Sequence, residues 1–226
     1  MAKNKINEKL VKYNFSSRKG TPIKYIVLHD TANKKVGADA DAHFEFFNAR
    51  DRQSSAHYFV DDKQILRIIK DQDKSWAVGD GKGKYGITNE NSINVEMCIN
   101  ADGDINKTYD NTLFLIKDLM EHYNIPLDRV VRHYDASKKI CPNIWSYNNW
   151  NKWYKFKKGL ENLNKPKVDY KAVINKLYVN IFGRAADAEG LNYWNDKLIN
   201  GLTFGDFLKS LGESEEFKEI YIYNIN

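Results

Sequence analysis

Cysteine is scarce in this chain, which contains only Cys98 and Cys141. Two cysteines cannot build a disulfide scaffold, and such low usage is typical of a reduced compartment. No apolar run approaches the roughly 18 residues that a membrane-spanning helix needs, so we expect no contact with a membrane. The N-terminus, MAKNKINEKL, has lysines but no apolar segment after them. We therefore expect no secretory signal peptide and synthesis in the cytoplasm.

Dense runs of lysine and arginine are also missing, although the net charge is +5. The excess of positive charge lies before residue 164. A basic surface attracts anionic polymers. Without a basic run or an RNA-binding aromatic motif, however, nucleic acid is not the expected partner. Another anionic polymer, or a solvated basic face with no partner, remains open.

Hydrophobic periodicity alternates between strand-like and helix-like segments up to about residue 160. We expect strands at 23–28, 92–99 and 129–132, a hairpin formed by HYFV and QILRII, and helices near 38–47, 113–123 and 150–160. Residues 1–20 are polar and predict an irregular lead-in, while the glycine-rich stretch 79–86 predicts a flexible loop. Strands interleaved with helices predict an α/β fold with a mixed central β-sheet flanked by helices.

A second domain is predicted after a first domain of residues 1–163. Residues 164–167 have the composition of a linker, because Pro166 breaks helices and the flanking lysines favour solvent. Apolar residues then recur at helical spacing through 168–226, which predicts a small all-α domain. No histidine or cysteine follows Cys141, so we expect no metal site in that domain.

Three residues carry side chains that suit zinc: His29, His133 and Cys141. His29 follows an apolar strand, and the other two flank the segment HYDASKKIC. Zinc binds imidazole nitrogen and thiolate sulfur, and catalytic zinc sites keep three protein ligands and a water. Spread over half the chain, the same residues are equally compatible with ordinary core positions. A disulfide between Cys98 and Cys141 would consume one of the three.

The sequence around these residues carries a resemblance to a known family. The segments IVLHDTA, SSAHYFVDD, NSINVEMCIN and VRHYDASKKICP are similar to those of zinc-dependent N-acetylmuramoyl-L-alanine amidases of the type 2 superfamily. Phage lysins and animal peptidoglycan recognition proteins belong to it. The resemblance covers residues 23–163. It implies the type 2 amidase fold and Zn²⁺ bound by His29, His133 and Cys141.

Glu96 is the candidate general base and acid. It is a carboxylate within the apolar strand 92–99, on the face opposite Val95 and Met97. Burial of a carboxylate is costly unless it is paired or bound to a ligand. A glutamate on an edge strand facing water would give the same pattern. The resemblance favours the functional interpretation, because a glutamate in this motif acts as the catalytic base in the family.

The resemblance implies a second catalytic residue, Lys139, whose cation would stabilise the oxyanion of the reaction. A solvated lysine pair with Lys138 is the alternative. Ala56 occupies the position at which some family members have a catalytic tyrosine, which places more weight on Glu96. His57 is expected to orient or pack near the site and not to bind the metal.

These features imply a zinc amidase that cleaves the bond between N-acetylmuramic acid and L-alanine in the peptidoglycan of a Gram-positive cell wall. The expected setting is a phage or prophage endolysin that reaches the wall after release from the cytoplasm. A bacterial autolysin and a non-catalytic peptidoglycan-binding protein are the alternatives, although non-catalytic relatives typically lack the ligand at Cys141. Residues 168–226 resemble a small helical domain of unassigned function, which we expect to bind the wall, including its anionic polymers.

Overall fold

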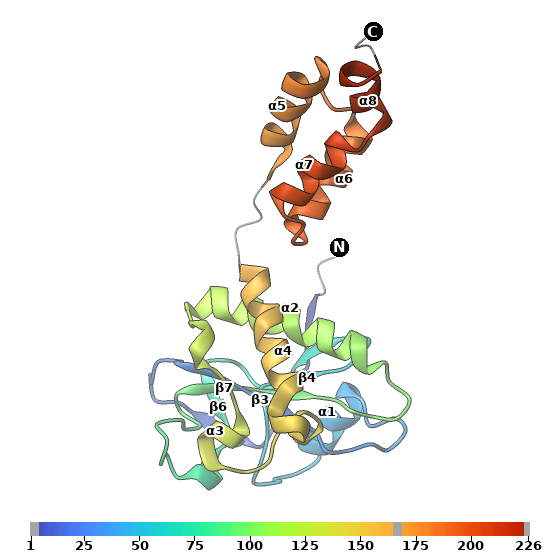
Figure 1. Cartoon of the computed structure of the whole chain (residues 1–226). Helices are drawn as coiled ribbons and strands as arrows, with labels where there is room; N and C mark the ends of the chain where they lie inside the picture. Colours follow the sequence, from blue (N-terminus) through green and yellow to red (C-terminus); the bar gives the residue numbers. More distant parts are fainter. Residues whose placement is uncertain (1–4, 165–168, 224–226) are drawn as a thin grey trace. The chain divides into compact units, whose positions relative to one another are not determined.

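The chain separates into two compact units, Met1–Asn164 and Lys165–Asn226, in the computed structural model (Figure 1). The structure describes residues 5–164 and 169–223. Of the predicted linker 164–167, Asn164 is the last residue of a helix, and 165–167 lie outside the described residues. Each unit is described separately below.

A mixed sheet of six strands forms the centre of the first unit, in the order β1-β5-β4-β7-β3-β8. Neighbouring strands run parallel, except that β4 and β5 form the predicted antiparallel hairpin. The mixed sheet is thus confirmed. The strands are β1 (Ile6–Glu8), β3 (Tyr25–Asp30), β4 (Tyr58–Val60), β5 (Ile65–Arg67), β7 (Ser92–Met97) and β8 (Val130–Arg132).

The N-terminal segment, expected to be mostly irregular, contributes two short strands within residues 5–20. Strand β1 pairs parallel with β5 at the edge of the main sheet. Strand β2 (Phe15–Ser17) pairs antiparallel with β6 (Asp73–Ser75) in a separate two-stranded sheet. Backbone groups make these pairings, and both strands leave most of their side chains partly or fully exposed. Hydropathy therefore gave no signal for them.

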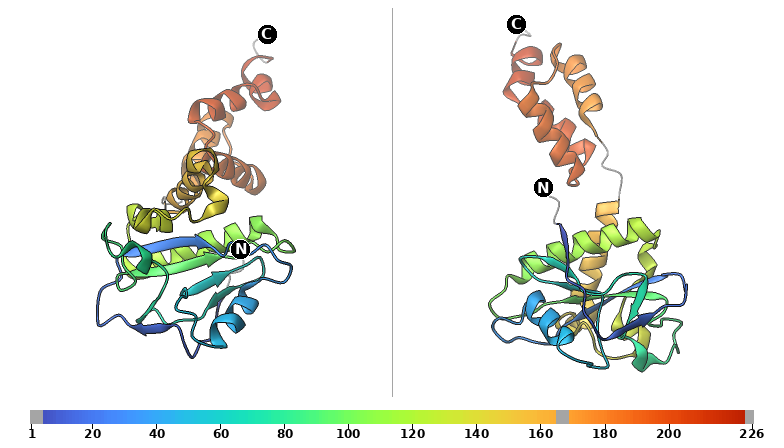
Figure 2. Two further views of the ribbon diagram at one scale, coloured as in Figure 1. Left: turned by 90° about the horizontal axis from the view of Figure 1, so that it is seen from below. Right: turned by 180° about the vertical axis from the view of Figure 1, so that it is seen from behind.

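One face of the main sheet is covered by α2 (Ile105–Tyr123) and α4 (Tyr147–Asn164), as Figures 1 and 2 show. Helix α2 begins earlier than its apolar periodicity predicted, because Asp104 accepts hydrogen bonds from the backbone of its first turn. It ends at Asn124, whose φ of 51° is the left-handed conformation of a helix C-cap. The core on this face includes Ile26, Leu28, Val95, Met97, Leu115, Ile116, Leu119, Trp153, Phe156 and Leu160.

The opposite face of the sheet is covered only in part. Helix α1 (Ala40–Asn48) packs over β4 and β5, where Phe59 and Leu66 are buried. At the other side, α3 (His133–Ser137) and the 3₁₀ turn η1 (Gly79–Gly81) border a small apolar cluster around Val27. Between these two covers, strands β3 and β7 present polar side chains.

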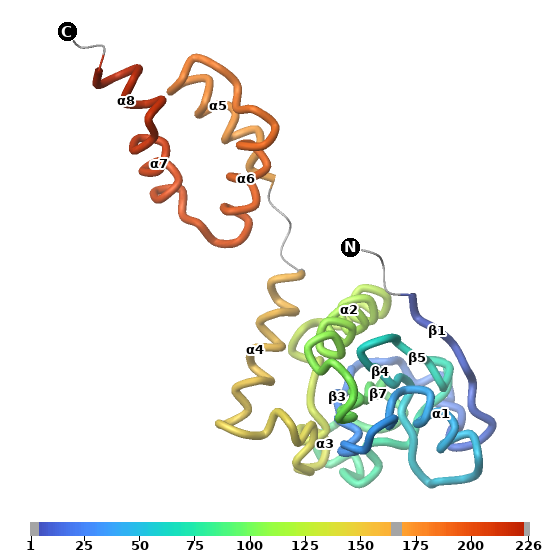
Figure 3. Tube along the Cα trace, turned by 90° about the vertical axis from the view of Figure 1, so that its right-hand side faces the viewer, coloured from blue at the N-terminus to red at the C-terminus, as the bar shows by residue number. Residues whose placement is uncertain are grey.

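Four helices form the second unit: α5 (Lys171–Phe182), α6 (Ala188–Ile199), α7 (Phe204–Gly212) and α8 (Glu215–Tyr221), drawn as a tube in Figure 3. Its core contains Ile174, Tyr178, Leu198, Phe207 and Leu211. The indole Nε1 of Trp194 donates to the hydroxyl of Tyr178 at 3.1 Å, so both aromatic residues serve packing. The all-α character agrees with the helical spacing of the sequence.

No helix within the described parts of the chain combines the length and the apolar character needed to cross a membrane.

Candidate active site

The three predicted metal ligands meet at the carboxyl ends of parallel strands β3 and β8. His29 lies near the end of β3, and His133 follows β8 directly. One donor atom from each of His29, His133 and Cys141 lies within 4.8 Å of the others, and all three residues are buried. The Sγ atom of Cys141 is 3.7 Å from Nδ1 of His29. The carboxyl ends of parallel strands are the usual place for ligand sites in such sheets.

The imidazole of His29 is held so that its Nδ1 faces this cluster. Its Nε2 lies 3.0 Å from Oδ1 of Asn94. The amide Nδ2 of Asn94 donates to Oγ of Ser75 and Oγ of Ser92, so Oδ1 is the acceptor and Nε2 of His29 carries the proton. Burial, with a contribution from nearby His133, lowers the pKa of His29 to about 3. The ring is therefore neutral, with a free lone pair on Nδ1.

His133 is held in the same way by Asp80, a residue that the sequence analysis did not select. Nε2 of His133 donates to Oδ1 of Asp80 at 2.9 Å, and Oγ of Ser137 donates to Oδ2 of Asp80 at 3.1 Å. Nδ1 of His133 is buried and has no hydrogen-bond partner among the residues that the structure describes. A carboxylate that accepts the second ring proton is the usual support of a metal-binding histidine.

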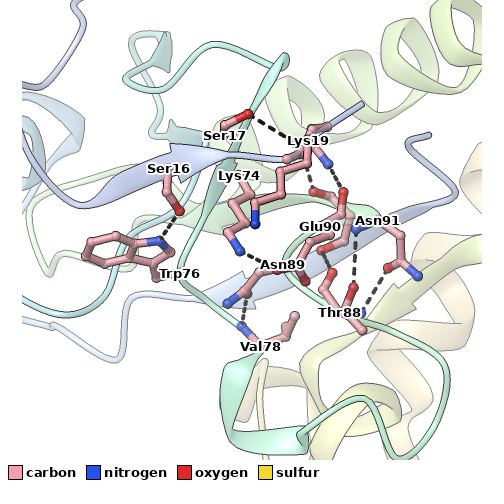
Figure 4. Close-up of polar contacts among 12 residues, drawn as sticks. Ser16, Ser17, Lys19, Lys74, Trp76, Val78, Thr88, Asn89, Glu90 and Asn91 are labelled. Atoms are coloured by element: carbon pink, nitrogen blue, oxygen red, sulfur yellow. Dashed lines mark hydrogen bonds and ion pairs between the residues drawn. The ribbon is translucent and has the colours of Figure 1, made fainter. Parts of the chain in front are cut away.

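The turn that carries Asp80 is anchored by Asn89. Oδ1 of Asn89 accepts hydrogen bonds from the backbone N–H groups of Ala77 and Val78, at 3.0 and 2.9 Å (Figure 4). Next to it, the carboxylate of Glu90 is paired with Lys74. The stretch 79–86, expected to be a flexible loop, therefore begins as a hydrogen-bonded turn.

Gly81 allows this turn to lie directly against helix α3. A Cβ atom at this position would overlap the backbone carbonyl of Ala136. Any larger residue would push the turn away from α3, and with it the carboxylate of Asp80 from His133. Close packing thus explains Gly81, whereas Gly83 and Gly86 have positive φ values of 70° and 76°.

Glu96 lies beside the ligand cluster on the same face of the sheet, because it pairs in register with His29. Its Oε2 atom is buried and lacks a hydrogen-bond partner within the described part of the chain. Burial, together with the charge of Asp30, raises the pKa of Glu96 to about 8, while the cation of Lys139 acts in the opposite direction. Without a further positive charge the carboxyl group is therefore mostly protonated at neutral pH.

Lys139 is exposed, yet its positive charge acts on several groups of the site. It lowers the pKa of Glu96 and Cys141 and disfavours protonation of His29. Burial raises the pKa of the Cys141 thiol well above its usual range, and the charge of Glu96 adds to this effect. The thiolate that a metal would bind thus needs the metal cation itself to be stable.

His57 lies behind the ligand cluster. Its Nδ1 accepts from the backbone N–H of Asn94 at 3.0 Å and lies 3.0 Å from Oγ of Ser75. Burial lowers the pKa of His57 to about 3. Asn94 in turn holds His29, and Ser75 accepts a hydrogen bond from Asn94, so the position of His57 agrees with the expectation that it orients or packs near the site.

A sequence profile described as N-acetylmuramoyl-L-alanine amidase matches residues 19–144, which is more than half of the chain. The chain belongs to this family. The matched segment contains the three candidate ligands and Glu96. The sequence-based assignment to the family is confirmed, while the roles of individual site residues stay predictions.

Two relatives that this chain matches come from Bacillus subtilis (strain 168). The chain is 43% identical to N-acetylmuramoyl-L-alanine amidase CwlH, and the match covers 52% of this chain and 46% of CwlH. It is 41% identical to N-acetylmuramoyl-L-alanine amidase XlyA, and that match covers 62% of this chain and 44% of XlyA. It therefore spans just under half the length of these relatives. A solved structure titled mutant endolysin from Bacillus subtilis matches 70% of this chain and 99% of that one, with 40% identity and a TM-score of 0.62.

A second profile, a domain of unknown function (DUF4214), matches residues 160–221 of the chain. This segment includes the four helices of the second unit. The match agrees with the resemblance to a helical domain of unassigned function.

We predict that Glu96→Gln stabilises the metal-free protein increasingly as pH rises. The folded-state pKa of about 8 exceeds the ordinary value of 4.5, so the folded state binds more protons between these values and loses stability as pH increases. Glutamine does not titrate, and each kcal/mol regained raises the melting temperature by about 2–4 °C. Melting temperatures at pH 5 and pH 9 measure the effect. The exposed Glu121→Gln is the control, and an equal difference at both pH values contradicts the prediction.

We also predict that Asp80→Asn weakens zinc binding by roughly 10–100-fold, because a support of a histidine ligand is lost. Competition with a chromophoric chelator measures the dissociation constant. Asp110→Asn on the exposed side of α2 is the matched control. Equal zinc affinity in the two variants would show that Asp80 does not support a metal ligand.

Proposed function

We propose that this chain hydrolyses the amide bond between the lactyl group of N-acetylmuramic acid and L-alanine in peptidoglycan. The family membership supports the reaction. The observation that carries the residue assignment is the convergence of one donor atom from each of His29, His133 and Cys141 at one buried point. Both histidines use Nε2 for hydrogen bonds to other residues, so Nδ1 of each ring is left for a metal ion.

The donor set fits Zn²⁺, which takes imidazole nitrogen and thiolate sulfur in catalytic sites with three protein ligands. The partnerless Nδ1 of His133 supports this fit, because a buried nitrogen without a partner is costly unless a ligand binds it. When bound, Zn²⁺ lowers the pKa of a water molecule to about 7 and polarises the substrate carbonyl. The protein residues perform the remaining steps.

Glu96 is proposed to accept the proton of the attacking water and to return it to the leaving nitrogen. Its raised pKa suits this role, since the group holds a proton readily. A nearby cation lowers that pKa towards neutral pH, where a general base and acid is most effective. Lys139 is proposed to stabilise the negative charge that develops on the carbonyl oxygen. Its exposed side chain can move towards this oxygen.

The proposed setting is lysis of a Gram-positive cell wall by a phage or prophage endolysin. The match to a solved structure titled mutant endolysin from Bacillus subtilis supports it. A bacterial autolysin would use the same residues and the same chemistry. The substrate in either setting is peptidoglycan.

The second unit is proposed to bind the cell wall, by its glycan or its anionic polymers. Tyr193 and Phe204 support this role, because their rings are 53% and 38% exposed, whereas Tyr178 is buried. Exposed aromatic rings offer flat surfaces for sugar rings. A tethered binder raises the local concentration of substrate without adding catalytic contacts.

We predict that the purified protein releases free L-alanine amino termini from cell walls and that Glu96→Gln lowers turnover by roughly 10²–10⁴-fold, because the proton acceptor is lost. Mass analysis of the products and zinc content measure both effects. Zinc content should stay near that of the unmodified protein, and Glu121→Gln should remain active. New reducing sugar ends without new amino termini would contradict the proposed reaction.

We further predict that a chain ending at Asn164 cleaves soluble muropeptide at the rate of the full chain but lyses whole cells more slowly. Turbidity of host cells and release of amino termini from muropeptide measure the two activities. Equal lysis by both proteins would indicate that the second unit does not bind the wall.

A further inference from the structure

A pocket of about 370 Å³ lies next to Glu96, between the sheet and helix α1. Phe59 of β4 and Phe46 and Phe47 of α1 supply apolar walls. Thr31 and His43 line the same pocket together with Glu96. His43 stacks on Phe59 with ring centroids 5.0 Å apart.

Unsatisfied polar atoms concentrate in this pocket. Oγ1 of Thr31, Nε2 of His43 and Oε2 of Glu96 are buried and have no hydrogen-bond partner in the described ranges 5–164 and 169–223. A fourth such atom is Nδ1 of His133 in the ligand cluster. Each unpaired buried polar atom costs free energy. Three of them around one pocket therefore indicate a place where a polar ligand binds.

The register of the sheet places the pocket next to the ligand cluster. Phe59 pairs with Glu96, and Glu96 pairs with His29, so the three side chains form one row across β4, β7 and β3 on one face. Neighbouring strands lie about 4.8 Å apart. A substrate that crosses the strands with its scissile amide at the cluster therefore extends over Glu96 into the pocket.

The position of Glu96 also indicates which half of the substrate enters the pocket. The group that returns a proton to the leaving nitrogen must lie on the side of the leaving product. In the proposed amidase reaction that product is the peptide, whose first residue is L-alanine. Since Glu96 stands between the cluster and the pocket, the pocket lies on the peptide side.

The chemistry of the pocket favours an uncharged polar group. None of the residues that line it is a lysine or arginine. The guanidinium of Arg52 lies 3.7 Å from the ring centroid of Phe46, but Arg52 does not line the pocket. Burial lowers the pKa of His43, against a smaller opposite effect of Asp39, so the imidazole is neutral. A carboxylate would lose hydration here without gaining a counterion. A carboxamide offers both donors and an acceptor to the unpaired atoms.

We propose that this pocket binds the stem-peptide residue that follows L-alanine, and that His43 and Thr31 select a side chain ending in a carboxamide over one ending in a carboxylate. The inference rests on the proposed amidase reaction. It adds to that reaction a specificity site and the chemical class of group that the site accepts.

Two synthetic substrates test the proposal. Both are N-acetylmuramoyl-L-alanyl peptides that differ only in the second residue, which carries a carboxamide in one and a carboxylate in the other. We expect kcat/KM of the full chain to favour the carboxamide by at least about tenfold, since buried polar groups reject a poorly matched partner. His43→Leu and Thr31→Val should each reduce this ratio towards one.

Matched variants separate specificity from damage to the fold. His122→Leu makes the same substitution at an exposed histidine of α2 and should keep the ratio. Ala42→Lys places a cation at the pocket from an exposed position of α1, and it should shift the preference towards the carboxylate. Circular dichroism and melting temperature verify folding of each variant.

The outcomes are distinguishable. Equal cleavage of the two substrates by the unmodified chain, or a ratio that neither His43→Leu nor Ala42→Lys changes, overturns the pocket assignment and leaves the amidase reaction intact. Failure to release L-alanine amino termini from either substrate contradicts the amidase reaction itself. The effect of His43→Leu could instead depend on added sugar units while the preference for the carboxamide stays unchanged. That result would place the glycan in the pocket and also overturn the proposal.

Discussion

The parallel pairing of β3 with β7 and β8 is the constraint on which the candidate site depends. It brings His29 and Glu96 into one row and makes His133 the first residue after the neighbouring strand. The same pairing carries Asn94 to the second nitrogen of His29. A shift of β7 by one residue would turn Glu96 to the apolar face under α2 and α4 and remove both contacts. The register of these three strands therefore decides which side chains meet at the candidate site.

Burial gives the site its electrostatic character. It favours the neutral forms of His29, Glu96 and Cys141, so the metal-free site is a cluster of uncharged donors. Neutral imidazoles are ready to bind a cation, whereas the carboxyl and thiol groups ionise only when positive charge arrives. A divalent cation thus changes the protonation of its surroundings when it binds. The exposed charge of Lys139 acts in the same direction on Glu96 and Cys141.

Hydrophobic patterning predicted the central strands, the hairpin and the helices that cover the sheet, because these elements bury apolar faces. It missed β1 and β2, since edge pairing uses backbone groups and leaves polar side chains in water. The family resemblance selected His29, Glu96, Lys139, His133 and Cys141, and the structure places the three candidate ligands and Glu96 together. Asp80 was missed because its partner His133 lies far along the chain. The glycines on either side of it were the available signal, and they were interpreted as flexibility.

The close contact of Gly81 with α3 has a consequence for metal exchange. The carboxylate that fixes His133 belongs to a surface turn, and this turn is held by Asn89, by the contact of Gly81 with α3 and by the hydrogen bond from Ser137 to Asp80. Surface turns open locally far more often than a domain unfolds. Each opening frees the His133 ring to rotate while the central sheet stays intact. The lifetime of a zinc ion bound as proposed would then depend on the opening rate of a peripheral segment, and changes in residues that never touch the ion would alter how long it stays.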